Sequence, residues 1–202
     1  ENPLWDSTNN KFSFVPWITA NGGGVDVLYV ALNLNDCHPW QEFSASDTTG
    51  HMKDLKDFIN TFNEEYPYAQ VRLLTFSIPS QDGGLGANYH AGPDTDAYGL
   101  AKTVWNQNEA YEDLAEDGSY SSWLEIVDLT TQFDCEYNYP KSFRAANRRR
   151  QNSSAYSDVN DRYKVYYDTN GLHPDMPGYY QWADAIWRNF VAEFCQPNDE
   201  QE

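Results

Sequence analysis

The sequence predicts an open α/β fold built on a parallel β-sheet. Two observations support this prediction. Short, nearly continuous apolar runs recur along the chain, which is typical of strands buried on both faces of a parallel sheet. Between them lie segments whose apolar residues recur at three- and four-residue steps, which is typical of amphipathic helices. Strands that alternate with helices in this way indicate an open α/β sheet.

Three apolar runs are the predicted strands. The first covers residues 25–32 ("VDVLYVAL") and follows the glycine-rich stretch "NGGG". The second covers residues 71–78 ("VRLLTFSI") and is stopped by Pro79. The third covers residues 124–129 ("LEIVDL"). We expect these runs to form the core of the sheet.

Three helical patterns accompany the strands. One apolar stripe lies within residues 52–62, and a second helix is predicted over residues 98–117, ending at Gly118. The clearest pattern is in the last helix, whose apolar positions are Tyr179, Trp182, Ala183, Ile186, Trp187, Phe190, Val191 and Phe194. We expect this apolar face to be buried.

Length and charge limit the class of protein. The 202 residues are enough for one full core, so we expect a single domain over residues 1–202. The net charge of −18 argues against nucleic acid and anionic membrane surfaces as partners. No segment approaches the roughly 20 apolar residues of a membrane span.

No spacing of the three cysteines suggests a metal site, and we expect no cofactor.

Two long polar segments, residues 80–96 and 141–162, interrupt the alternation of strands and helices. Long loops in a compact domain are often functional. The second segment includes "RRR" at residues 148–150, which either contacts an anionic group or is a solvated charge cluster.

The candidate site lies where the strands end, because open α/β sheets bind ligands beyond the carboxyl ends of their strands. The first strand runs into "NLND", so Asn35 and Asp36 lie at this edge. A fixed asparagine amide can donate a hydrogen bond to an oxyanion. His173 lies in a loop directly before the last helix. The alternative interpretation is structural, with Asn35 or Asp36 as a cap and His173 as a hydrogen-bonded loop residue.

Two motifs together resemble the SGNH (GDSL-like) serine esterase family over nearly the whole chain. "VDVLYVALNLND" is similar to the family's third block, and "NGLHPDMPGYYQWADAIW" is similar to its fifth block. The stretches "NPLWDSTNNKFSF" and "IPSQDGGLGANYHAG" also resemble segments between blocks in one branch of the family. The resemblance implies a three-layer, flavodoxin-like fold with a parallel sheet whose first strand is missing from these residues.

The resemblance also implies roles for residues. His173 matches the general base that takes a proton from a serine hydroxyl, and Asn35 matches the oxyanion donor. The reaction would pass through an acyl-serine intermediate that water releases. Asn170 stands where the family usually has an acidic residue that orients the histidine. Asp168 is the alternative orienting residue, unless it is an ordinary loop acid.

The chain departs from the family pattern at three places. Asn33 replaces the third-block glycine, and Asn170 offers the imidazolium no negative charge. The third departure is the absence of a Gly-Asp-Ser motif anywhere in the 202 residues. Ser7 and Ser80 are the candidate substitutes by position, but neither lies at a suitable strand-to-helix elbow.

We therefore expect polypeptide outside these residues to complete the sheet and supply the nucleophile, with the N-terminal fragment of the same protein as the first candidate and another chain as the second. Without it, the first predicted strand would present an open edge, and the chain should not be stable alone. Cys37 and Cys135 both follow strands and are the more plausible disulfide pair, and the alternative is that the cysteines are buried or free thiols. Cys195 ends the last helix, where the missing segment is its candidate partner.

Three classes of function follow from these observations. The first is an esterase or carbohydrate deacetylase, secreted or surface-associated, whose ester-bearing substrate would stack on Trp40, Tyr89 or Tyr98; these aromatic residues would otherwise pack under loops. The second is a non-catalytic binding or structural module, such as a surface or virion component, on a decayed esterase scaffold. The third is an acid/base glycosidase, but no carboxylate pair stands out by its placement.

Overall fold

The computed structural model describes residues 2–32, 40–77, 97–133, 141–145, 164–168 and 176–195. It divides into two compact units. The first unit consists of residues 1–36, 42–75 and 106–127, and the second consists of residues 37–41, 76–105 and 128–202. The single domain over residues 1–202 stays a prediction.

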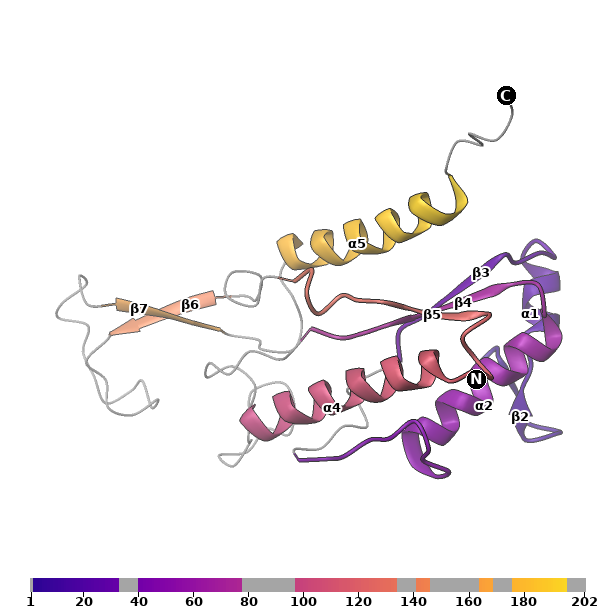
Figure 1. Ribbon diagram of the computed structural model, residues 1–202. Coiled ribbons are helices and arrows are strands. Elements are labelled where there is room, and N and C mark those ends of the chain that lie inside the picture. The colour runs from indigo at the N-terminus through magenta and orange to yellow at the C-terminus, as the bar shows by residue number, and fades with distance from the viewer. Residues whose placement is uncertain are drawn as a thin grey trace. The chain divides into compact units, whose positions relative to one another are not determined.

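The first unit contains the predicted parallel sheet (Figure 1). Its strands are β3 (Val27–Val30), β4 (Gln70–Leu74) and β5 (Leu124–Val127), in the order β3-β4-β5. Both pairs are parallel, and the register aligns Leu28 with Val71 and Val71 with Leu124. The α/β class with a parallel sheet is confirmed. The strands are shorter than the apolar runs in the sequence, because backbone pairing between neighbouring strands ends before the apolar residues do.

Two helices cover one face of this sheet: α2 (Gly50–Glu65) and the second half of α4 (Ala97–Glu116) (Figure 1). Alternate strand residues face these helices, since the side chains of a strand alternate between its two faces. The core comprises Phe14, Ile18, Val30, Met52, Leu55, Ile59, Phe62, Ala69, Val71, Leu73, Ala110, Tyr111, Leu114 and Leu124. Each large apolar side chain buried here contributes about 1.5–3 kcal/mol to stability.

A buried charged residue, Arg72, lies on the other face of the sheet. The register aligns Tyr29, Arg72 and Glu125, and the Arg72 side chain is fully buried. Its Nη2 lies 3.4 Å from Glu125 Oε2, and its Nη1 donates to the Val71 carbonyl at 3.4 Å. These contacts offset part of the cost of burying a charge.

The first unit also contains elements that the sequence did not predict. A hairpin pairs β1 (Trp5–Asp6) with β2 (Lys11–Phe12), and the short helix α1 (Val15–Ala20) follows. The Glu65 carboxylate accepts the backbone N–H groups of Phe14 at 2.6 Å and Val15 at 3.1 Å. A residue on α2 therefore holds the start of α1.

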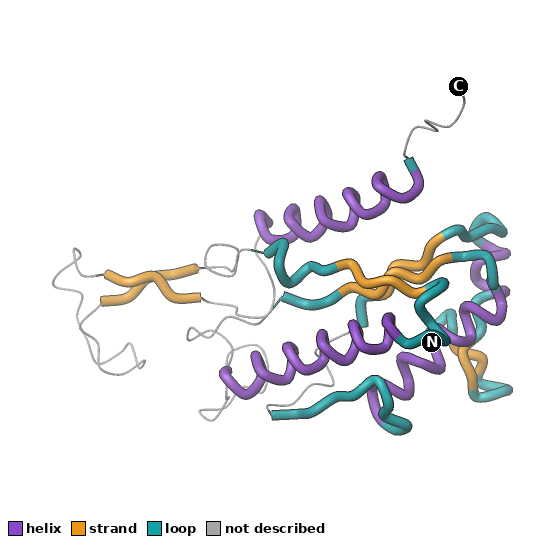
Figure 2. Tube along the Cα trace, viewed as in Figure 1, coloured by secondary structure: helices purple, strands orange, loops and turns teal. Residues whose placement is uncertain are grey.

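The second unit contains a second antiparallel hairpin, seen in Figure 2 as a separate pair of orange strands. It pairs β6 (Lys141–Ala145) with β7 (Lys164–Asp168). The prediction of a polar loop over residues 141–162 was wrong at its start, since residues 141–145 form a strand. A two-stranded ribbon with polar residues lacks the apolar run by which the other strands were found.

The last helix, α5 (Met176–Phe194), also belongs to the second unit. Its Trp182 ring packs against Phe76 at 6.4 Å and Phe133 at 5.7 Å between centroids. The prediction that its apolar face is wholly buried was wrong, because Tyr179, Trp187 and Phe194 are exposed, Trp187 by 61%. The aromatic residues of α5 lie on one side of the helix, and among the described residues of other elements the ring contacts of this side are those of Trp182 with Phe76 and Phe133. No described helix has both the length and the apolar content needed to cross a membrane.

Candidate functional site

The carboxyl edge of the parallel sheet begins at the ends of β3, β4 and β5. The Thr75 N–H, one residue after β4, donates to the Val127 carbonyl at 3.1 Å, so pairing extends to this edge. Leu32 is the last described residue after β3, three positions before Asn35. Asn35 and Asp36 themselves lie outside the described residues. The structure therefore confirms the strand that leads to Asn35, and the role of Asn35 stays a prediction.

A polar cluster holds the chain where it leaves β3. The Tyr111 hydroxyl donates to the Leu32 carbonyl at 2.8 Å. Gln107 Nε2 donates to Tyr111 Oη at 2.8 Å and lies 2.9 Å from His51 Nε2. His51 Nε2 lies 2.6 Å from Tyr111 Oη. We call His51, Gln107 and Tyr111 the β3-exit cluster, because they tie α2 and α4 to the end of that strand.

The protons in this cluster are limited in number. Tyr111 has one hydroxyl proton, which serves either the Leu32 carbonyl or His51 Nε2. When that proton serves Leu32, His51 Nε2 either donates to the tyrosine oxygen or accepts a hydrogen bond from Gln107. In the tautomer with its proton on Nδ1, His51 Nε2 accepts a hydrogen bond from the Tyr111 hydroxyl or the Gln107 amide. An accepting His51 Nε2 thus competes with the Leu32 carbonyl for the Tyr111 hydroxyl proton.

Sequence reasoning missed the β3-exit cluster. His51, Gln107 and Tyr111 lie 19, 75 and 79 positions from Leu32, so no local motif joins them. The sequence feature that could have indicated this cluster is a polar residue, Gln107, on the apolar side of the predicted helix. Gln107 is fully buried, one helical turn before the buried Tyr111, and a buried amide requires hydrogen-bond partners.

In the second unit, α5 begins at Met176, three residues after His173. Asp168 is the last residue of β7, and its backbone is paired with that of Lys141. His173 and Asn170 lie outside the described residues. The helix that follows the histidine is therefore confirmed, and the convergence of His173 with Asn35 stays a prediction.

The structure describes only some of the other residues that the sequence suggested for the site. Ser7 lies in the turn between β1 and β2, exposed to solvent. Ser80, Tyr89 and residues 148–150 lie outside the described residues. Tyr98 lies in the first turn of α4.

Trp40 has an unusual backbone. Its φ of 65° is rare for a bulky residue, and its side chain is 55% exposed. The Trp40 N–H donates to the Gly99 carbonyl at 3.1 Å, and the Gln41 N–H donates to Thr103 Oγ1 at 2.9 Å. These bonds to α4 hold the segment within the second unit. Strained backbone of this kind clusters at functional sites.

The described residues contain no group of three metal-ligating side chains. Cys195 carries a free, exposed thiol at the end of α5. Cys37 and Cys135 lie outside the described residues, so the disulfide between them stays a prediction.

Comparisons with known proteins give limited similarity. No protein-family model and no curated protein matches the sequence. A solved structure from Streptococcus pneumonia, named for platelet activating factor, is 16% identical with a TM-score of 0.41, over 68% of this chain and 49% of that chain. A Chitinophaga pinensis protein described as a possible lipase is 16% identical with a TM-score of 0.45, over 86% and 76%. This chain thus spans about half the length of the first neighbour, and at this similarity neither neighbour assigns an activity to it.

Proposed function

We propose that this chain forms part of a serine ester hydrolase of the SGNH type, an esterase or a carbohydrate deacetylase. One observation carries the proposal: β3, the strand that leads directly into the "NLND" motif, is a strand of a parallel sheet. Ligands of open α/β sheets bind beyond the carboxyl ends of such strands. The helix α5, which starts directly after the histidine motif, supports the same assignment.

The proposed roles follow from the chemistry of acyl transfer. His173 takes the proton of a serine hydroxyl as that oxygen attacks the ester carbonyl. The Asn35 amide donates to the oxyanion of the tetrahedral intermediate. Asn170, or alternatively Asp168, accepts the other imidazole N–H and selects the tautomer. Water then hydrolyses the acyl-serine.

The attacking serine is proposed to come from polypeptide outside these 202 residues, since no Gly-Asp-Ser motif occurs within them. Among the described residues, β3 pairs with β4 on one side only. An edge strand of this kind is a template for another strand. The N-terminal fragment of the same protein, or a second chain, is therefore proposed to pair with β3 and bring the nucleophile.

Trp40 is the proposed contact for the alcohol part of the substrate. It is exposed and held by the first turns of α4. An aromatic face presented in this way can stack on the apolar face of a sugar ring. This feature favours a carbohydrate ester over a simple alkyl ester.

Hydrolysis of 4-nitrophenyl acetate by the whole product of the gene tests the proposal. His173→Ala should lower kcat about 10²–10⁴-fold, as expected for the loss of a general base. Asn35→Ala should lower kcat about 10²–10³-fold through the loss of an oxyanion donor. Asn63→Ala on α2 is the matched amide control and should retain activity. Full activity in His173→Ala would contradict the proposal.

Labelling with a fluorophosphonate, followed by peptide mapping, identifies the nucleophile in the same preparation. We expect the label on a serine outside these 202 residues. A label on Ser7 or Ser80 would instead place the nucleophile within the chain and remove the need for a partner.

The second candidate function is a binding or structural module on a scaffold that has lost catalysis. The substitutions Asn33 and Asn170 and the missing Gly-Asp-Ser motif favour it. The same preparation distinguishes the two functions. If the whole gene product neither hydrolyses the ester nor reacts with the fluorophosphonate, the binding function is the correct one.

A further inference from the structure

A groove lies between the β1–β2 hairpin and the outer side of α2, within the first unit. We call it the hairpin groove. Its volume is about 610 Å³, and it is lined by Trp5, Asn10, Lys11, Phe12, Lys53, Asp54, Asp57, Asn60, Thr61 and Glu64. Sites for small molecules typically have volumes of roughly 300–1,000 Å³. The hairpin groove is therefore large enough for a ligand of several rings.

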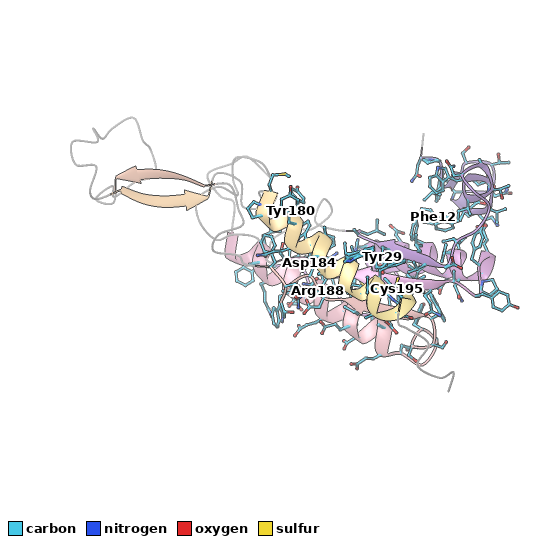
Figure 3. The ribbon with its side chains drawn as sticks, turned by 90° about the horizontal axis from the view of Figure 1, so that it is seen from above. Phe12, Tyr29, Tyr180, Asp184, Arg188 and Cys195 are labelled. Atoms are coloured by element: carbon cyan, nitrogen blue, oxygen red, sulfur yellow. The ribbon has the colours of Figure 1, made fainter. Side chains whose placement is uncertain are left out.

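An aromatic wall forms the hairpin side of the groove. Trp5 is 40% exposed, and its ring packs edge-on against Phe12 at 5.1 Å. Phe12, labelled in Figure 3, packs in turn against Phe58 of the core at 5.0 Å. Because Trp5 rests on a chain of packed rings, it presents apolar surface to the groove at little cost in conformational entropy.

Polar side chains from the outer stripe of α2 form the opposite wall. Within the described part of the chain, Asp54 and Glu64 have no hydrogen bond or ion pair, and both are exposed. Asn60 Nδ2 donates to Tyr120 Oη at 3.2 Å, which leaves the Asn60 amide oxygen as an acceptor for a ligand. Lys53 is paired with Asp57. The wall thus offers acceptors and donors side by side.

The chemistry of these walls restricts the ligand. The groove contains three carboxylates and two ammonium groups, so it disfavours phosphates and other anions. Its polar α2 wall disfavours a wholly apolar ligand. Each hydroxyl of a sugar is both a donor and an acceptor, and one face of the ring is made of C–H groups. A neutral sugar chain therefore matches an aromatic wall that faces mixed donors and acceptors.

We propose that the hairpin groove binds a neutral oligosaccharide, which stacks on Trp5 and hydrogen-bonds to Asp54, Asn60 and Glu64. This site shares no residue with those proposed for ester hydrolysis. The proposal does not rest on catalysis, since the groove would bind sugar equally in an active or an inactive protein.

The turn of the hairpin supports a preformed groove. Asp6 Oδ1 accepts the backbone N–H groups of Thr8 at 2.9 Å and Asn9 at 3.1 Å, and Asp6 Oδ2 accepts the Asn9 side-chain amide at 2.7 Å. These bonds shape the turn that ends at Asn10, whose φ is 52°. A preorganised wall loses little entropy when the ligand binds.

Isothermal titration calorimetry of the whole gene product with cellohexaose, xylohexaose and chitohexaose tests this proposal. At least one of these sugars should bind. Trp5→Ala should weaken its binding about tenfold or more, because the stacking surface is lost. The double variant Asp54→Ala/Glu64→Ala should weaken it similarly. Both acidic residues are exposed, so this variant is expected to fold even where Trp5→Ala disturbs the hairpin.

Trp17→Ala is the matched control, because Trp17 is 46% exposed on α1 and does not line the groove. Its sugar affinity should equal that of the unchanged protein. Failure of all three sugars to bind would overturn the proposal. Equal affinity in the control and the Asp54→Ala/Glu64→Ala variant would also overturn it. Ester hydrolysis without sugar binding would contradict this proposal alone.

Discussion

At the scale of single residues, acidic side chains shape this protein by accepting backbone N–H groups. Glu65 holds the start of α1, and Asp6 forms the turn of the first hairpin. Asp117 accepts the Ser119 N–H at 2.8 Å in the turn after α4. These contacts are short in range except for that of Glu65, which joins residues about 50 positions apart. Some of the acidic side chains of this protein therefore stabilise turns and helix starts.

The turn of the first hairpin gives a prediction about pH. The hydrogen bond from the Asn9 side chain is the main cause that holds the pKa of Asp6 below its ordinary value of 3.8. Because the folded pKa is lowered, the stabilisation is present above the unfolded pKa and is lost as the pH falls through the folded pKa. Asn9→Ala should raise the pKa of Asp6 toward 3.8, as measured by NMR titration of its carboxyl carbon.

Asp117 is the internal control for this titration. Its pKa is lowered by hydrogen bonds from Ser119, in a turn that Asn9 does not touch. The pKa of Asp117 should therefore be the same in both proteins. An unchanged pKa of Asp6 in Asn9→Ala would contradict the assigned cause.

At the scale of elements, the secondary-structure predictions succeeded where buried residues form a continuous apolar run or recur at helical spacing. Residues 25–32 contain β3, β4 begins one residue before the predicted range 71–78, and the helix predicted over residues 98–117 is α4 within one residue at each end. The first hairpin was missed because two-residue strands are too short to show alternation. The start of the second hairpin was assigned to a loop for its polar composition. Hairpins of this kind depend on turn contacts and partners rather than on a periodic apolar pattern.

The β3-exit cluster gives a prediction about how elements are joined. Tyr111→Phe removes the donor to the Leu32 carbonyl and the acceptor for Gln107. Loss of the Tyr111 bonds to the buried Gln107 amide and the part-buried Leu32 carbonyl should lower the free energy of unfolding by about 1–3 kcal/mol. Urea denaturation measures this change. The expected loss also frees the exit of β3, so hydrogen exchange of the β3 amides that pair with β4 should become faster.

Tyr68→Phe is the matched control, because Tyr68 is 97% exposed and its hydroxyl has no partner among the described residues. Its stability should stay within about 0.5 kcal/mol of the unchanged protein. Equal stability of the two variants would show that the cluster does not hold the strand.

At the scale of the whole molecule, the dominant feature is the net charge of −18. Charge of one sign destabilises a compact state through self-repulsion. Raising sodium chloride from about 0.01 to about 0.1 M shortens the Debye length from roughly 30 to roughly 10 Å. The melting temperature should rise by about 2–4 °C for each kcal/mol gained. Differential scanning fluorimetry measures this rise.

A charge-reduced variant controls for other effects of salt. Glu109, Asp113 and Glu116 are exposed acids on α4, and their replacement by Gln, Asn and Gln should reduce the response. A melting temperature that falls with salt, or the same response in both proteins, would contradict repulsion as the cause.

The sequence by itself determined the parallel strands, the long helices and the motifs around Asn35 and His173. These features depend on local periodicity and on spacing along the chain, which are visible before folding. Only the tertiary structure decided that Tyr111 meets the Leu32 carbonyl and His51, and that Trp5 faces the outer stripe of α2. Such contacts join residues about 50 to 80 positions apart, and they exist only because buried polar groups and apolar surfaces must find partners when the chain packs.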